Sequence, residues 1–357
     1  MEVYVLNRDF ISIKMIDEFE SFIWTDRYYE CGDFELFLSM DKDLVNYIVK
    51  GYYLWFAESE HIMIIEDFKI KTDVEDGNKL IVTGRSLESI LERRIIWGQK
   101  ICTGNLQEMI QGLLTEAIIS PSISDRAIGN FVYEASTDSR ITALTIDAQY
   151  FGDDLYSIIS GLCMAYDIGF KITLNSSNKF VFSLYCGSDH SYEQSENPYV
   201  IFSPNFENII NSDYYESNSN LKNVTLVAGE GEGADCKTIM VGSASGLDRR
   251  EIFTDARHIS STVDGRTLSM SEYEAQLTQK GNDTLAEKTL VKAFEGEAET
   301  TQMFVYGVDF FIGDIVQVEN EYGHEGRAYI TEIIFSQDEG GISIYPTFST
   351  IQDEGDD

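Results

Sequence analysis

The motif closest to a chemical signature is the glycine-rich stretch from Gly229 to Gly233, in which glycine alternates with Glu230 and Glu232. It follows a predicted strand, as phosphate-binding loops do. Such loops also need a lysine to hold the phosphate, and this stretch has none where one is required. Its two glutamates would repel an anion. We therefore interpret the stretch as a flexible loop, and we expect no cofactor.

Other side chains capable of acid–base, metal or nucleophilic chemistry form no recognisable motif. No GxSxG sequence surrounds a serine, and no cysteine has a nearby histidine. Carboxylates are so numerous that choosing pairs of them as acid and base has no value. The histidines lack the HxxxH spacing of a metal site and are expected at the surface or at strand ends: His61, His190, His258 and His324. We predict no catalytic, cofactor-binding or metal site, and hence no enzyme.

The few concentrated positive charges are two arginine pairs, Arg93–Arg94 and Arg249–Arg250. Two interpretations remain open. Each pair can form local ion pairs with neighbouring carboxylates, namely Glu88, Glu92, Asp248 and Glu251. Alternatively, the arginines can bind carboxylates of another subunit, because a guanidinium group holds a carboxylate with two hydrogen bonds. Local pairing is the more frequent outcome and is weak. Arg93, Arg94, Arg249 and Arg250 are thus candidate subunit-interface residues.

The composition describes a folded and strongly acidic protein. The chain has 357 residues, of which 61 are acidic and 26 basic, for a formal net charge of −35. Such a surface repels nucleic acid, because binding requires lysine and arginine to replace counterions on the phosphates. Hydrophobic residues make up 43% and aromatic residues 12%, which is enough for cores and favours β structure. The length predicts two to four domains.

The chain shows no feature of secretion or membrane insertion. The five cysteines are scattered and odd in number, which is typical of reduced thiols in a protein made in a cytoplasm. Met1 leads directly into a predicted strand, so no signal peptide is expected. No apolar run approaches the roughly 18 residues of a membrane helix.

Changes in residue pattern divide the chain into four units and a tail. Residues 1–97 and the split segments 199–228 and 291–350 alternate in hydrophobicity as strands do, whereas 98–198 contains two amphipathic helices and a hairpin. The predicted fold class is α+β, predominantly β, with two related small β-barrels and two smaller mixed α/β subdomains. The barrels are 1–97 and 199–228 with 291–350, the mixed units are 98–198 and the inserted 229–290, and 351–357 is an acidic tail.

The two predicted barrels share a repeated motif. Residues 51–83 contain a glycine, a short strand, a long strand, a turn and a returning strand, and the same order recurs from Gly313. Within the long strand, Ile65-x-Asp67-Phe68-x-Ile70 corresponds to Ile330-x-Glu332-Ile333-x-Phe335. The turn before the long strand must differ, because Gly51 and Ile65 are 14 positions apart whereas Gly313 and Ile330 are 17 apart.

Five segments resemble the tail-hub family of siphophages and prophages, which is similar to the N-terminal part of tail-associated lysins and to the hub of T-even tails. They are Ser21–Tyr28, Gly32–Leu36, Met63–Glu66, Thr83–Leu91 and Leu247–Glu251. The resemblance implies a structural hub at the tail tip that forms a ring-shaped homotrimer. Three chains with two related barrels each would present six positions to a sixfold tail tube.

The resemblance also implies partners and a location. The partners would be the distal tail protein, the tape measure protein and a tail fibre or receptor-binding protein, with DNA passing through an acidic lumen without specific binding. The location would be the virion tail tip, after synthesis in the bacterial cytoplasm, and a long non-contractile tail is favoured.

Two alternative functions remain open. Tail-associated lysins continue into a peptidase or glycosidase region, so a cell-wall hydrolase is one alternative. We expect no such region here, because the chain stops soon after Phe348. The other alternative is a carbohydrate-binding receptor module, suggested by the aromatic pairs Tyr28–Tyr29 and Tyr214–Tyr215. Aromatic pairs in strands, however, usually serve packing.

Overall fold

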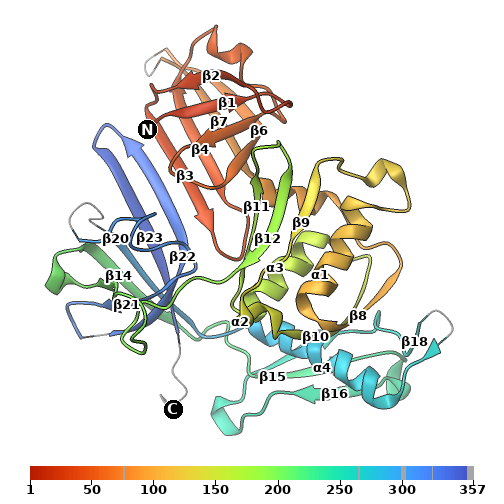
Figure 1. Ribbon diagram of the computed structural model, residues 1–357. Helices are drawn as coiled ribbons and strands as arrows, with labels where there is room; N and C mark the ends of the chain where they lie inside the picture. The colour runs from red at the N-terminus through yellow and green to blue at the C-terminus, as the bar shows by residue number, and fades with distance from the viewer. Residues whose placement is uncertain (75–76, 264–265, 299–302, 324, 352–357) are drawn as a thin grey trace.

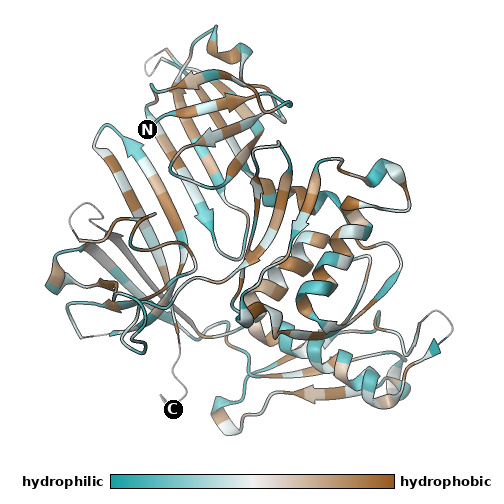
Figure 2. Cartoon of the chain, viewed as in Figure 1, coloured by the Kyte–Doolittle hydropathy of each residue, from teal (hydrophilic) through white to brown (hydrophobic). Residues whose placement is uncertain are grey.

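Alternating hydrophobic side chains build one long sheet that runs through both ends of the chain (Figures 1 and 2). The computed structural model describes residues 1–74, 77–263, 266–298, 303–323 and 325–351. We call the first half of the sheet the N-terminal β unit; it contains β1 (Val3–Leu6), β2 (Ser12–Ile16), β3 (Ser21–Arg27), β4 (Asp33–Ser39), β5 (Tyr53–Phe56), β6 (Ile62–Thr72) and β7 (Asn78–Ser86). The C-terminal β unit contains β13 (Ile201–Phe202), β14 (Ile209–Ser217), β20 (Val291–Ala298), β21 (Ile315–Glu319), β22 (Glu325–Asp338) and β23 (Gly341–Thr350).

The hydrogen-bonded order of this sheet is β14-β20-β23-β22-β3-β4-β7-β6-β5-β1-β2, with β21 and β13 attached beside β22. The two units are joined where β22 pairs with β3. Among the described residues the path remains open at β14 and β2, so the pairing does not confirm the two closed barrels predicted from the sequence. Alternation determines which face of a strand is buried, but it does not determine which strand lies next to it.

The internal repeat is confirmed in detail. Gly51 and Gly313 both have positive φ values, of 82° and 89°, and both donate a backbone hydrogen bond of 2.8 Å, to Ile65 and Ile330 respectively. Each long strand then has a bulge at the same place, between Ile65 and Asp67 in β6 and between Ile330 and Glu332 in β22. The strands β5, β6 and β7 therefore correspond to β21, β22 and β23.

The segment between the two β units first forms a mixed α/β layer. It contains β8 (Gln99–Asn105), α1 (Leu106–Leu114), β9 (Phe131–Glu134), α2 (Ser139–Thr142), β10 (Thr145–Phe151), α3 (Leu155–Ala165), β11 (Gly169–Leu174) and β12 (Phe180–Tyr185). Asn105 and Asp154 cap α1 and α3 by accepting hydrogen bonds from the backbone N–H groups of Glu108 and Ser157. The predicted helices and hairpin are thus present, and their apolar faces form a core of their own.

The inserted segment forms a second, smaller layer. Strands β15 (Val224–Ala228), β16 (Thr238–Val241) and β17 (Glu251–Asp255) form a sheet, and β18 (Thr262–Val263) pairs with β19 (Arg266–Thr267). Helix α4 (Met270–Ala286) packs on this sheet and is longer than the sequence pattern indicated (Figure 1). It begins with a capping box, in which Ser269 and Glu272 each bond the other's backbone N–H. The acidic tail from residue 352 lies outside the described residues.

Candidate functional site

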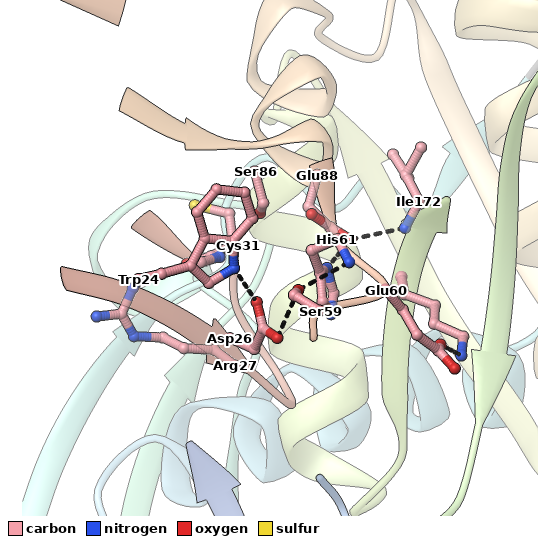
Figure 3. A network of polar contacts seen from close by, with 12 residues as sticks. Trp24, Asp26, Arg27, Cys31, Ser59, Glu60, His61, Ser86, Glu88 and Ile172 are labelled. Carbon is pink, nitrogen blue, oxygen red and sulfur yellow. Dashed lines mark hydrogen bonds and ion pairs between the residues drawn. The ribbon is translucent and has the colours of Figure 1, made fainter. Parts of the chain in front are cut away.

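A chain of buried polar groups connects the N-terminal β unit to the mixed layer (Figure 3). Asp26 on β3 accepts hydrogen bonds from Trp24 Nε1 at 2.9 Å and from Ser59 Oγ at 2.7 Å. Ser59 lies in the turn between β5 and β6, and its Oγ accepts from the backbone N–H of His61 at 3.0 Å. This turn therefore holds a carboxylate and an imidazole side by side in the interior.

The chain of contacts ends in a buried ion pair between His61 and Glu88. His61 Nδ1 lies 3.0 Å from Glu88 Oε1, and the same oxygen accepts from the backbone N–H of Ile172 on β11 at 2.7 Å. Glu88 belongs to the 3-10 helix η2 (Leu87–Arg93), and both charged side chains are almost fully buried. Two units of the protein are thus linked through one carboxylate, and breaking such a pair is costly.

The pKa values follow from burial and from the opposite charges. Burial disfavours the imidazolium ion, but the carboxylates of Glu88 and Asp26 outweigh it and raise the pKa of His61 to about 9. Burial would raise the pKa of Glu88, yet the charge and hydrogen bond of His61 hold it below its usual range. Burial is the main cause that raises the pKa of Asp26.

Ser59, His61 and Asp26 are the residue types of a hydrolase triad, but their geometry differs from one. The Ser59 hydroxyl donates to Asp26, and His61 Nδ1 is bonded to Glu88. A serine nucleophile needs the imidazole as its hydrogen-bond partner and must be reached by a substrate. Ser59 is 7% exposed. The arrangement is that of a structural polar network.

A cavity of about 590 Å³ opens beside this network, where the two β units and the mixed layer meet. Asp26, Ser59 and His61 lie on the side of the N-terminal β unit, and Tyr185 comes from β12. The C-terminal β unit contributes aromatic and aliphatic side chains, namely Tyr306, Phe311, Ile312, Phe335 and Ile344.

No helix in the described ranges is long and apolar enough to cross a membrane.

The predicted interface arginines lie in separate parts of the molecule, and Arg94, Arg249 and Arg250 have partners within the chain. Arg94 donates to the backbone carbonyl of Arg126 at 3.0 and 2.8 Å, and Arg93 is exposed. Arg249 pairs with Glu251 at 2.5 Å, as the local interpretation predicted, and Arg250 donates to the carbonyl of Asn218. An interface role for these arginines stays a prediction.

The histidines differ from the sequence interpretation in one case. His61 does precede a strand, but it is buried, because η2 and β11 cover it with Glu88 and Ile172. His190 hydrogen-bonds the carbonyl of Pro198 at 2.8 Å, and His258 is exposed. His324 lies outside the described residues. Among the residues described, no group of histidine, cysteine, aspartate and glutamate could hold a metal ion.

The aromatic pair Tyr28–Tyr29 is not the exposed platform that a carbohydrate-binding module would need. Tyr28 is fully buried between the units, and the Tyr29 hydroxyl donates to Asp167 at 3.2 Å. In the other pair, Tyr214 packs against the main core and only Tyr215 is exposed. The glycine-rich loop leads into a 3-10 turn, Gly233–Asp235, and the backbone N–H of Glu230 donates to the hydroxyl of the α4 residue Tyr273 at 2.6 Å.

The edges of the long sheet are a second candidate site, for assembly. The outer half of β22, from Glu332 to Gln337, pairs with β3, and Arg27 forms an ion pair of 3.2 Å with Glu332. The corresponding half of β6, from Asp67 to Thr72, pairs only with β7 and is exposed on its other edge. At the end of the sheet β14 pairs only with β20. Besides β2 at the far end of the sheet, the described strands therefore leave the edges of β14 and of the outer half of β6 open.

Sequence reasoning missed both of these features. The burial of His61 and Glu88 depends on β11, which is more than 80 residues away, and the β3–β22 junction joins residues about 300 apart. For the β3–β22 junction, the one signal in the sequence was the repeat. Two related long strands are expected to have equivalent neighbours, so the partner of β22 points to a partner for β6.

Comparison with known proteins identifies the family of this chain and solved structures with a similar fold. Residues 2–348 match the family described as Siphovirus ReqiPepy6 Gp37-like protein. The tail protein of Neisseria meningitidis MC58 has a similar structure, with a TM-score of 0.58 and 13% identity over 99% of this chain and 96% of that one. The 43 kDa tail protein of prophage MuSo2 from Shewanella oneidensis gives 0.58 and 12% over 98% of each chain.

A third similar structure is prophage tail protein gp18 of Listeria monocytogenes EGD-e, with a TM-score of 0.55 and 12% identity over 99% of this chain and 96% of that one. No curated protein matches the sequence. At these identities the structures establish the fold, which is that of phage and prophage tail proteins. The family match over residues 2–348 confirms the resemblance to phage tail proteins found in the sequence.

Proposed function

We propose, from the premise that this chain belongs to the Siphovirus ReqiPepy6 Gp37-like family, that it is a structural hub in a phage tail and forms a closed ring of three copies. The observation that supports the ring is the difference between the two related long strands. One edge is covered within the chain by β3, and the equivalent edge of β6 is open.

An open strand edge favours pairing with another strand, because its backbone N–H and C=O groups lack partners within the sheet. The repeat indicates which strand would pair with β6. In the N-terminal β unit, β3 is the strand beyond β4; in the C-terminal β unit, β14 is the strand beyond β20. The repeat makes β14 equivalent to β3 and β6 equivalent to β22. Because β3 pairs with β22 within the chain, β14 of a second copy would pair with β6 of the first.

The register of this contact can be worked out. Ile23 on β3 pairs with Glu35 on β4, which in turn pairs with Thr83 on β7. In the same way, Asp213 on β14 pairs with Glu295 on β20, which pairs with Thr347 on β23. The repeat makes Thr83 and Thr347 equivalent, because they pair with Asp67 and Glu332. Asp213 therefore corresponds to Ile23.

Because Ser336 pairs with Ile23 and corresponds to Lys71, the contact would place Lys71 opposite Asp213. Two residues along each strand, Lys69 would lie opposite Tyr215. Opposite charges directly across a strand pair are favourable.

This contact is head-to-tail, since it joins two different surfaces, and such contacts form either closed rings or open filaments. Three copies would alternate three internal and three external junctions and present six related units to a sixfold tube. The hub would sit at the tail tip, contact the distal tail protein, the tape measure protein and a fibre or receptor-binding protein, and let DNA pass its acidic surface.

The unit boundaries 1–97, 98–198, 199–228 with 291–350, and 229–290 are part of this proposal. So are the arginine pairs Arg93–Arg94 and Arg249–Arg250 as contacts with neighbouring subunits. Ring formation, and not barrel closure within a chain, would then cover the open strand edges.

The test is a disulfide cross-link between Lys69→Cys and Tyr215→Cys. Both side chains are exposed and would face each other across the external junction. Oxidation of the double variant should give covalent dimers and trimers, and particles with threefold symmetry in electron microscopy.

A matched control combines Lys69→Cys with Leu247→Cys, because Leu247 is 99% exposed but lies away from the sheet edge. This control should remain unlinked. The proposal fails if the test variant stays monomeric, or if cross-linking continues beyond three copies into filaments.

A further inference from the structure

The cavity beside the buried network has the features of a ligand site that the hub function does not use. Its volume of about 590 Å³ lies in the range of small-molecule sites, which often occur between domains. One wall is aromatic and aliphatic, through Tyr306, Phe311, Phe335 and Ile344, and the opposite wall carries charged side chains. Phe311 is half exposed, so the cavity is accessible at that side.

One polar group in the cavity wall lacks a partner. The Tyr185 hydroxyl is buried and has no hydrogen-bond partner among the described residues. Buried hydroxyl groups are normally hydrogen-bonded, because an unsatisfied one costs free energy. A ligand atom that donates to this oxygen would satisfy it.

The charge of the lining selects the sign of the ligand. Four carboxylates line the cavity, on Asp26, Glu58, Glu60 and Asp314, against two basic side chains, Lys171 and His61. An anion would therefore be repelled. Asp26 is almost completely buried in the wall, 1% exposed, and Ser59 connects it to His61.

The protein's own lysine shows how a cation lies in this setting. Lys171 pairs with Glu60, and its Nζ lies 5.0 Å from the centre of the Tyr185 ring (Figure 3 shows the Glu60 side of the site). Carboxylates together with an aromatic face form a suitable environment for an ammonium or guanidinium group. The apolar walls beyond it suit a hydrocarbon chain.

We propose that this cavity binds an organic cation whose alkyl chain lies along Tyr306, Phe311 and Phe335 and whose guanidinium or ammonium group donates to the Tyr185 hydroxyl beside Asp26. The cation can be a free amine or an arginine or lysine side chain of a partner. The site does not depend on ring formation, because all of its lining belongs to one chain.

The test uses the full-length protein and isothermal titration calorimetry. The probes are butylguanidinium, the neutral butylurea of similar shape, and a capped Gly-Arg-Gly peptide. We expect saturable one-site binding of butylguanidinium and at least tenfold weaker binding of butylurea. Tighter binding of the peptide would identify a partner's side chain as the source, and binding of butylguanidinium alone would identify a free cation.

The decisive variant is Tyr185→Phe. Because the hydroxyl has no partner to lose, the variant should keep the stability of the parent protein. It should bind butylguanidinium about tenfold more weakly, since hydrogen bonds to charged groups are strong. Glu58→Gln at the rim should weaken binding about twofold.

Tyr322→Phe is the matched control, because Tyr322 is 82% exposed and lies outside the cavity. It should leave binding unchanged. The proposal is overturned if butylguanidinium does not bind saturably, if butylurea binds equally well, or if Tyr185→Phe binds as tightly as the parent.

Discussion

The two halves of the long sheet contain the same three-stranded motif, but they complete it differently. In the C-terminal β unit the long strand β22 has β21 and then β3 along one edge. In the N-terminal β unit the equivalent strand β6 has β5 along the first part of that edge, and the rest is exposed. In the proposed ring, another copy of the chain would supply the neighbour that β6 lacks.

A second difference concerns the interior. The N-terminal β unit contains the buried ion pair of His61 and Glu88, whereas the repeat puts Gly326 at the position of His61. Asp26 corresponds to Glu216, which is exposed. The buried ion pair therefore adds to the apolar contacts of Ile62 and Ile64 with the mixed layer, and the C-terminal β unit has no equivalent of this pair at the corresponding positions.

The largest loss of stability is expected when alanine replaces one of the two equivalent glycines, Gly51 and Gly313. A Cβ at Gly313 would lie 2.4 Å from the ring of Tyr28, which is fully buried and cannot move away. A Cβ at Gly51 would meet only the flexible end of Arg8, at 3.4 Å. Both positions have positive φ, which costs about 1–2 kcal/mol for alanine.

Adding the clash, we expect Gly313→Ala to lower the free energy of unfolding by about 3–5 kcal/mol, and Gly51→Ala by about 1–2 kcal/mol. Urea denaturation of both variants measures the difference. Equal losses would show that the two glycines are in equivalent environments, contrary to the packing of Tyr28.

The repeat, the helices and the acidic character could be predicted from the sequence, because each depends on residues that are close together in the chain. The pattern Ile65-x-Asp67 of β6 recurs in β22, and the structure shows the same bulge at both places. Asp154 before an apolar helical face marks the start of α3.

Features that depend on distant residues could not be predicted. The pairing of β22 with β3 is one such feature, because nothing in either strand alone specifies that partner. The burial of His61 likewise requires Ile172 and Glu88 to be brought together by the fold. The expected position of His61 at the end of a strand is confirmed, because β6 begins at Ile62, but its burial was not predicted.

The second prediction concerns pH and tests the charged attachment of the N-terminal β unit. The pKa of His61 is raised to about 9 in the folded protein, from an ordinary value of about 6.5. The folded state therefore holds a proton that the unfolded state releases between these values. The stabilisation from His61 is complete below pH 6.5 and is lost as the pH rises through 9.

Between pH 6.5 and 8.5 the free energy of unfolding should fall by up to about 1.4 kcal/mol per pH unit. Urea titrations at several pH values measure this slope. His61→Gln should remove most of it, and His190→Gln should retain it. If His61→Gln keeps the full slope, the imidazole is not the charged partner of Glu88.

The smallest effect should come from the proposed external junction, where Lys71 of one copy would face Asp213 of the next. Both side chains are exposed in the single chain, so Lys71→Asp should hardly change the free energy of unfolding of a monomer. It should weaken trimer formation by about 0.2–1 kcal/mol per junction, which is the usual range for exposed ion pairs.

Three features distinguish this pairing from a general effect of charge. Lys179→Asp makes the same charge change at an exposed position in the turn between β11 and β12, and it should leave the trimer intact. The combination of Lys71→Asp with Asp213→Lys should restore association. The difference between single and double variants should shrink at high salt, because screening weakens exposed pairs. Sedimentation equilibrium measures the association of the parent protein, Lys71→Asp, the control variant and the double variant. A double variant that associates no more tightly than Lys71→Asp would show that β14 meets β6 in another register or not at all.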